Sequence, residues 1–232
     1  MNGIIIPVCV ITLPYALCLL SSIKKYCPGL EVGFLVKNEG TIPLKYQQQL
    51  DYIIEAPYGY DEKQPVDIIA YQAYYTTPFL KTLLLSPRSL VLSDISYIFE
   101  NAASMTLFVK QSYQHFLLEG HGPAILFDKS QSNAEFFEVL GEYSKNYMEI
   151  LGYQKITLGV SLGLLIGIVN QSFNFKTDDS LIITDVSSVE DEVECFIYDN
   201  SKIKMFNYRL YGLVTYNQLM TSDNLERFNE SD

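Results

Sequence analysis

Residues 77–100, TPFLKTLLLSPRSLVLSDISYIFE, contain the feature that most constrains the fold. Within them, residues 82–85 form a short apolar run after Lys81, which ends a predicted helix. A short, wholly apolar strand is typical of a parallel sheet covered on both faces. Residues 86–88, Ser-Pro-Arg, break that strand, and residues 90–92 are predicted to resume it. The sequence therefore predicts an α/β protein whose buried central strand is interrupted by a polar break.

The polar break is also the expected place for a binding site. Ligands of open α/β sheets gather outside the carboxyl ends of the strands. Ser86 and Arg88 stand where a buried strand ends. Both side chains are therefore candidates for the chemistry of the protein.

The amino-terminal part predicts further alternation of strands and helices. Residues 3–12 form a nearly continuous apolar run, suited to a central strand. Residues 13–26 carry apolar side chains at helical spacing before a Pro-Gly stop, and residues 31–37 give a second strand. Residues 52–55 and 66–75 predict another strand and another helix. This order is typical of a mostly parallel sheet with helices on both faces.

The segment around the break resembles the nucleotide-sugar glycosyltransferases of the GT-A fold, in particular the glycogenin and galactosyltransferase-like group. In that group a segment similar to TP-x-x-K-T-L-Y-L-D-x-D-T-L-V-x-x-D-I carries the metal-binding DxD motif. Ten positions match it: Thr77, Pro78, Lys81, Thr82, Leu83, Leu85, Leu90, Val91, Asp94 and Ile95. The two metal-binding aspartates fall on Ser86 and Arg88, so the frame of the motif is kept without its carboxylates.

The resemblance extends in order over residues 1–147 and implies a donor site. In the family, the end of the first strand and the start of the next helix hold the nucleotide base. The corresponding candidates for donor binding are Thr12, Pro14 and Tyr15, which a doubly wound protein could equally use for packing. The family also has an Asn-Ser-Gly turn that contacts the donor or acceptor sugar, and His121 stands in its place.

The carboxyl-terminal part departs from the family. After a long amphipathic helix with Ser132 as its predicted N-cap, the acidic pair of the family's acceptor site is replaced by Gly-Tyr-Gln-Lys. The family's late metal-binding His has no counterpart among residues 205–220. Residues 156–170 predict an apolar helix, and residues 194–208 predict a β-hairpin.

These differences from the family leave two interpretations of the chemistry open. Sugar transfer requires the leaving diphosphate to be neutralised, commonly by a divalent ion held by carboxylates. Residues 86–88 offer no such cage, so no divalent metal cofactor is expected. Arg88 would contact the diphosphate directly in a metal-independent transferase, with Lys81, Lys110 or Arg209 assisting. Alternatively, the chain is a catalytically degenerate relative, or a non-catalytic binding or assembly protein, for example a viral structural protein, on the same fold.

Composition limits the domain count and the partners. The 232 residues are 48% hydrophobic and 19% charged, which suits one domain over residues 1–222 and a polar tail over 223–232. A net charge of -11 argues against double-stranded nucleic acid as a partner, because that affinity comes from clustered Lys and Arg. The expected partners are a nucleotide-sugar and a glycan or protein acceptor. Binding to another protein, or to further copies of this chain, is left open. The motifs of serine hydrolases, P-loop NTPases and dinucleotide-binding enzymes are missing from the sequence.

Cysteine usage and hydropathy predict an intracellular protein. Cys9, Cys18, Cys27 and Cys195 show no C-x-x-C pairing, which is typical of small buried hydrophobes. The first residues lack a basic region before the apolar run, so no signal peptide is predicted, and no apolar run reaches the ~20 residues of a spanning helix. Abundant Ile, Tyr and Asn without Trp suit a low-GC genome, viral or bacterial, and a viral protein would reside in the virion.

Overall fold

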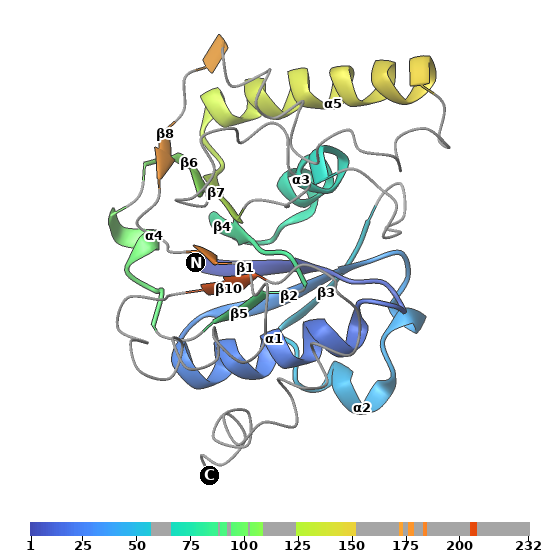
Figure 1. Cartoon of the computed structure of the whole chain (residues 1–232), viewed down its shortest axis with the longest axis vertical. Coiled ribbons are helices and arrows are strands. Elements are labelled where there is room, and N and C mark those ends of the chain that lie inside the picture. The colour runs from blue at the N-terminus through green and yellow to red at the C-terminus, as the bar shows by residue number, and fades with distance from the viewer. Residues whose placement is uncertain are drawn as a thin grey trace.

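The computed structural model describes residues 1–56, 66–87, 89–91, 94–101, 103–108, 124–151, 172–173, 176–178, 183–184 and 205–207. In this part of the chain a central β-sheet lies between two layers of helices (Figure 1). The elements are β1 (Asn2–Pro7), α1 (Leu13–Tyr26), β2 (Glu31–Val36), η1 (Glu39–Thr41), α2 (Leu44–Gln47), β3 (Tyr52–Glu55), α3 (Val66–Thr76), β4 (Lys81–Leu84), β5 (Ser89–Val91), α4 (Ile98–Asn101), β6 (Met105–Phe108), β7 (Ala124–Asp128), α5 (Gln131–Leu151), β8 (Lys176–Asp178), β9 (Ile183–Thr184) and β10 (Met205–Asn207). None of the helices described is both long and apolar enough to cross a bilayer.

The central sheet is mixed and mostly parallel, as predicted. Its seven strands lie in the order β3-β2-β1-β4-β7-β6-β8. Only β7 runs antiparallel to its neighbours, β4 and β6. The apolar strand β4 pairs with β1 on one side and β7 on the other, so it lies inside the sheet and not at an edge.

Alternating side chains of β1 explain why helices cover both faces. Ile4 and Ile6 pack into a core with α1, whereas Ile5 packs into a second core with α3 and α5. Figure 1 shows α1 on one side of the sheet and α3 and α5 on the other. All three isoleucines are 0% exposed, and full burial of such a side chain contributes about 1.5–3 kcal/mol.

The prediction that Lys81 ends a helix is wrong. Helix α3 ends at Thr76, and Lys81 is the first residue of β4. The helix stops because a residue that precedes proline, here Thr77 before Pro78, disfavours the helical conformation. The hydroxyl of Thr77 then accepts a hydrogen bond from the Phe79 N–H at 3.2 Å, which stabilises the turn into the strand.

The prediction that residues 90–92 resume the central strand is also wrong. Ser89–Val91 forms β5, which belongs to a separate three-stranded sheet in the order β5-β10-β9. Strand β5 pairs antiparallel with β10, which in turn pairs parallel with β9. The break after β4 is therefore a turn between two sheets and not an interruption within one strand.

Helix α5 begins two residues earlier than predicted, because Ser132 as N-cap would make residue 133 the first helical one. The first helical residue is Gln131, so Ser132 lies inside the first turn. The side chain of Asn133 donates hydrogen bonds to the backbone oxygen of Ser104, at 2.9 Å, and to Asp128 Oδ1, at 2.8 Å. These bonds tie the first turn of α5 to the end of β7 and to the residue that precedes β6.

The carboxyl-terminal predictions mostly lie outside the described residues. The predicted helix over 156–170 and the polar tail over 223–232 lie wholly outside them. Of the predicted hairpin over 194–208, only Met205–Asn207 is described, and it forms β10.

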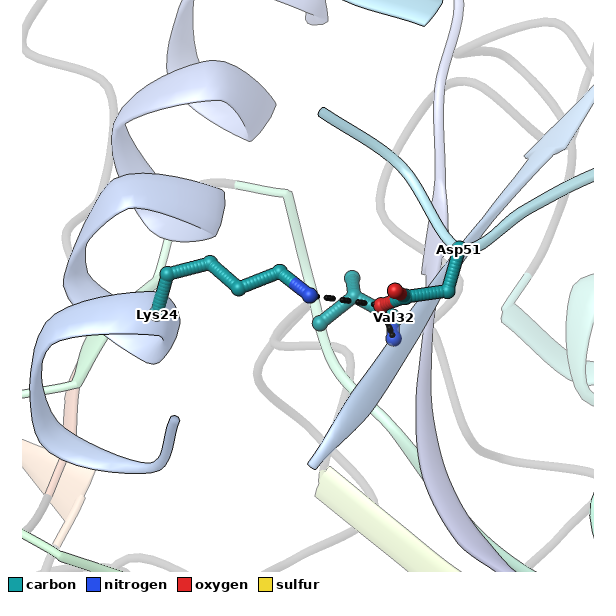
Figure 2. Close-up of polar contacts among 3 residues, drawn as sticks. All are labelled: Lys24, Val32 and Asp51. Carbon is teal, nitrogen blue, oxygen red and sulfur yellow. Dashed lines mark hydrogen bonds and ion pairs between the residues drawn. The ribbon is translucent and has the colours of Figure 1, made fainter. Parts of the chain in front are cut away.

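A charged contact joins α1 to the amino ends of β2 and β3. Figure 2 shows Lys24 on α1 pointing toward Asp51, which immediately precedes β3. Lys24 Nζ donates to Asp51 Oδ2 at 2.6 Å, and the backbone N–H of Val32 in β2 donates to the same oxygen at 2.8 Å. One carboxylate oxygen therefore holds a helix and two strands in register.

The contact shifts the acidity of Asp51. Partial burial alone would raise its pKa, but the hydrogen bonds from Lys24 and from the Val32 N–H, together with the Lys24 charge, outweigh burial. The pKa of Asp51 is therefore lowered. A carboxyl whose pKa is lower in the folded state stabilises the fold above its ordinary pKa, and this contribution is lost as the pH falls through the folded value.

We predict that Asp51→Ala lowers the free energy of unfolding by about 1–3 kcal/mol, because the N–H of the buried residue Val32 loses a charged acceptor. Lys24→Ala should cost less than about 1 kcal/mol, since the pair is roughly one-third exposed and the Val32 bond remains. Urea unfolding from pH 7 to pH 2 measures both. The advantage of the wild type over Asp51→Ala should be full above about pH 4 and shrink progressively below it, and an advantage as large at pH 2 as at pH 7 would contradict the assignment.

Candidate functional site

The carboxyl ends of β1 and β4 meet at the point where the strand order reverses. From β1 the chain continues to β2 and β3 on one side, and then returns through α3 to β4 on the other side of β1. The ladder continues past the strand ends, because the Val8 N–H donates to the Leu35 oxygen at 2.8 Å and the Leu85 N–H donates to the Ile5 oxygen at 3.0 Å. Such a reversal is the usual ligand site of an open α/β sheet.

The first side of this edge is a turn over residues 9–12. The predicted first strand was expected to reach Thr12, but β1 ends at Pro7. Thr12 Oγ1 accepts the Cys9 N–H at 2.9 Å, and the Thr12 N–H donates to the Cys9 oxygen at 3.1 Å. These bonds turn the chain away from the sheet and start α1.

The side chains of this turn and of the first turn of α1 differ in how far they are exposed. Thr12 is 2% exposed and Tyr15 is 3% exposed, whereas Pro14 lies exposed in the first turn of α1. Val10 and Ile11 are 74% and 62% exposed, and sequence reasoning missed them because they continue the apolar run of the strand. The surface of this turn therefore offers a ligand mainly apolar contacts, and the donor-binding roles of Thr12, Pro14 and Tyr15 stay predictions.

The second side of the edge is the turn that follows β4. Leu85 and Pro87 are buried, and Ser86 between them is half-buried. The register of β4 on β1 pairs Ile5 with Leu84, so Ser86 follows the carboxyl end of the strand beside β1. Arg88 lies outside the described residues, as does His121.

Lys81 does not lie at this edge. It pairs with Asn2 at the amino end of β4, so the whole strand separates it from Ser86. Its Nζ donates to the backbone oxygen of Phe99 at 2.8 Å. The structure thus brings Ser86 and the turn over residues 9–12 to one edge, and holds Lys81 at the other.

The residues at this edge do not fit the metal of the DxD motif. A divalent cation such as Mn²⁺ or Mg²⁺ prefers several oxygen ligands, including carboxylates, and Ser86 offers one neutral hydroxyl. Glu55 at the end of β3 is exposed, and its Oε1 accepts the Glu39 N–H at 3.2 Å. Within the described residues, no group of three or more His, Cys, Asp or Glu is placed to hold an ion.

The architecture is shared with known glycosyltransferases. The glycosyltransferase GlyE of Streptococcus pneumoniae TIGR4 matches with a TM-score of 0.59 at 12% identity, over 98% of this chain and 62% of GlyE. Its apo form matches with a TM-score of 0.61 at 10% identity, over 99% and 62% of the two chains. The galactosyltransferase LgtC, in complex with donor and acceptor sugar analogues, matches with a TM-score of 0.54 at 13% identity, over 99% and 94%.

These likenesses establish the fold and no more. The chain has the GT-A glycosyltransferase fold, as its sequence led us to expect, and it spans about three-fifths of the length of GlyE. No family model matches the sequence, and no curated protein matches it.

We predict that millimolar Mn²⁺ or Mg²⁺ leaves the melting temperature unchanged. An ion that binds the native state selectively must stabilise it by mass action, and the turn after β4 lacks the carboxylates to bind one. Scanning fluorimetry with each ion, with and without a chelator, measures the effect. An increase of several degrees that the chelator abolishes would show a metal site that the described residues do not reveal.

Proposed function

We propose that the edge formed by β1 and β4 binds a nucleotide-sugar and that the protein is a metal-independent glycosyltransferase. The observation that carries this proposal is the position of the turn after β4. Ser86 stands beside the turn over residues 9–12 at the strand-order reversal of a glycosyltransferase fold. Donor and acceptor therefore have a shared edge at which to meet.

In this proposal Arg88 takes over the role of the metal. It follows Ser86 and Pro87 in the sequence, where the family carries its second aspartate. A guanidinium is permanently charged and forms paired hydrogen bonds with phosphate oxygens, which a divalent cation would otherwise neutralise. Ser86 lies half-buried in the turn after β4, two residues before Arg88 in the sequence. Val10 and Ile11 supply the apolar surface against which a base can rest.

The reaction follows from these roles. An acceptor hydroxyl attacks the anomeric carbon of the donor sugar, the bond from that carbon to the diphosphate oxygen breaks, and the acceptor proton is released. Negative charge grows on the diphosphate as the bond breaks. Arg88 would stabilise that charge more in the transition state than in the bound donor, which is the condition for catalysis.

A catalytically degenerate relative is the second candidate. The observation that favours it is the separation of Lys81 from Ser86, which removes one expected cation from the diphosphate. Such a protein would bind a nucleotide-sugar without transferring the sugar, or would bind a glycan or a protein through the same fold. Nucleotide affinity separates these cases, because a nucleotide-sugar binder retains it and an assembly protein does not.

We predict that Arg88→Ala weakens the affinity for UDP or GDP by ten-fold or more, because a charge-assisted bond contributes about 1.5–3 kcal/mol. Calorimetric titration of the wild type and the variant with UDP, GDP and their common sugars measures the loss. Lys45→Ala, an exposed lysine on α2, is the charge-matched control. Lys81→Ala tests another cation that was expected to assist at the diphosphate. Because Lys81 lies at the amino end of β4, this variant should leave the affinity within two-fold.

Three outcomes would contradict the proposal. A wild type that binds neither UDP nor GDP would reject the nucleotide-sugar site. Equal losses in Arg88→Ala and Lys45→Ala would show that only the overall charge matters. A loss confined to Lys81→Ala would move the diphosphate to the amino end of β4. Where nucleotide binds, donor hydrolysis and transfer assays then separate an active enzyme from a degenerate one.

A further inference from the structure

The chain that follows the candidate site runs back along α1 outside the central sheet. Strand β4 rises to the carboxyl edge, and the chain then returns through β5 to Phe99, whose oxygen binds Lys81 at the amino end of β4. We call its described residues, 89–91 and 94–95, the return leg. Its described strand, β5, pairs with β10 and not with the central sheet. The position of the return leg therefore depends on contacts other than the central ladder.

Ser22 makes the first of these contacts. It lies in α1, is 2% exposed, and its hydroxyl accepts the backbone N–H of Val91 at 3.1 Å. The same hydroxyl donates to the backbone oxygen of Leu19 at 2.8 Å, which fixes its orientation. A serine inside a helix usually bonds only to its own helix. Here it also binds a strand that is distant in sequence.

Cys27 makes the second contact at the end of α1. Its thiol is 1% exposed, and its sulfur accepts the backbone N–H of Ile95 at 3.5 Å. Val91 and Ile95 are both 0% exposed and pack in the same core as α1. Apolar packing holds the return leg against the helix, but it is not directional. The two hydrogen bonds fix which residues of the leg face which turns of the helix.

We propose that Ser22 and Cys27 are positioning residues for the candidate site. The turn after β4 is held on one side by the Leu85 N–H bond to Ile5. On the other side it continues directly into the return leg, which Ser22 and Cys27 anchor. Helix α1 also carries Pro14 in its first turn, at the same edge. Helix α1 thus begins at the edge and, toward its other end, anchors the chain that leaves the edge; this role rests on the proposed function.

The test compares two neighbouring serines of α1. Ser22→Ala removes the acceptor of the Val91 N–H, whereas Ser21→Ala removes an exposed hydroxyl whose one bond within the described part of the chain is to the Leu17 oxygen, at 3.0 Å. Hydrogen exchange of peptides covering residues 85–96 reports on the return leg without any ligand. We expect faster exchange there in Ser22→Ala, with β1 and β2 unchanged, and no change in Ser21→Ala. The affinity for UDP should fall by about five-fold, the effect of one net hydrogen bond.

A second pair of variants examines Cys27. Cys27→Ala removes the acceptor of the Ile95 N–H, whereas Cys27→Ser keeps an acceptor at the same position of the side chain. We expect Cys27→Ala to speed exchange of the return leg and to weaken UDP binding, and Cys27→Ser to restore both. Asp51→Ala, which acts at the amino ends of β2 and β3, is the control for global destabilisation, and any faster exchange that it causes in the return leg sets the level that Ser22→Ala and Cys27→Ala must exceed.

The outcomes separate this inference from the proposed function. Unchanged exchange of the return leg in Ser22→Ala and Cys27→Ala overturns the inference, whatever UDP does. Faster exchange with undiminished UDP affinity also overturns it, because the leg would then not position the site. If the wild type binds no UDP or GDP, the proposed function fails and the positioning role fails with it, while the exchange data still show whether α1 anchors the leg.

Discussion

The parallel pairing of β1 with β2 and β4 is the constraint on which the rest of the structure depends. It places β1 inside the sheet, so its alternating isoleucines must be covered on both faces. It also aligns the carboxyl ends of β1 and β4, which brings Ser86 beside the turn over residues 9–12. The cores and the candidate edge therefore follow from one set of backbone hydrogen bonds.

Much of this fold could be predicted because its signals are local. Helix α1 begins at Leu13 and ends at Tyr26 as predicted, since a proline in its first turn and a Pro-Gly stop mark its ends. The departure of β5 from the central sheet could not be predicted, because its partner β10 lies far along the chain and no local pattern records the pairing. Tertiary pairing of this kind overrides strand propensity.

In the candidate site, too, features with a local signal could be predicted and features set by distant contacts could not. Ser86 was predictable because a polar residue after a buried strand must lie at the carboxyl edge. Lys81 matched the resemblance in residue type, but the direction of β4 places it at the opposite end. Val10 and Ile11 were missed because exposure depends on where the strand stops. After the strand, hydrogen bonds between Thr12 and Cys9 turn the chain away, and an apolar run does not reveal them.

The pairing of β5 with β10 has a consequence for the order in which the protein folds on the ribosome. Strands β1 to β4 and helix α1 are all synthesised before β5, whereas Met205–Asn207 is synthesised long after it. Contacts between such distant segments form slowly because the intervening chain must first be ordered. Until then, the nascent chain must hold its return leg against α1 by packing and the Ser22 and Cys27 bonds alone. A ribosome-bound chain would thus acquire a structured carboxyl edge before its small sheet is complete.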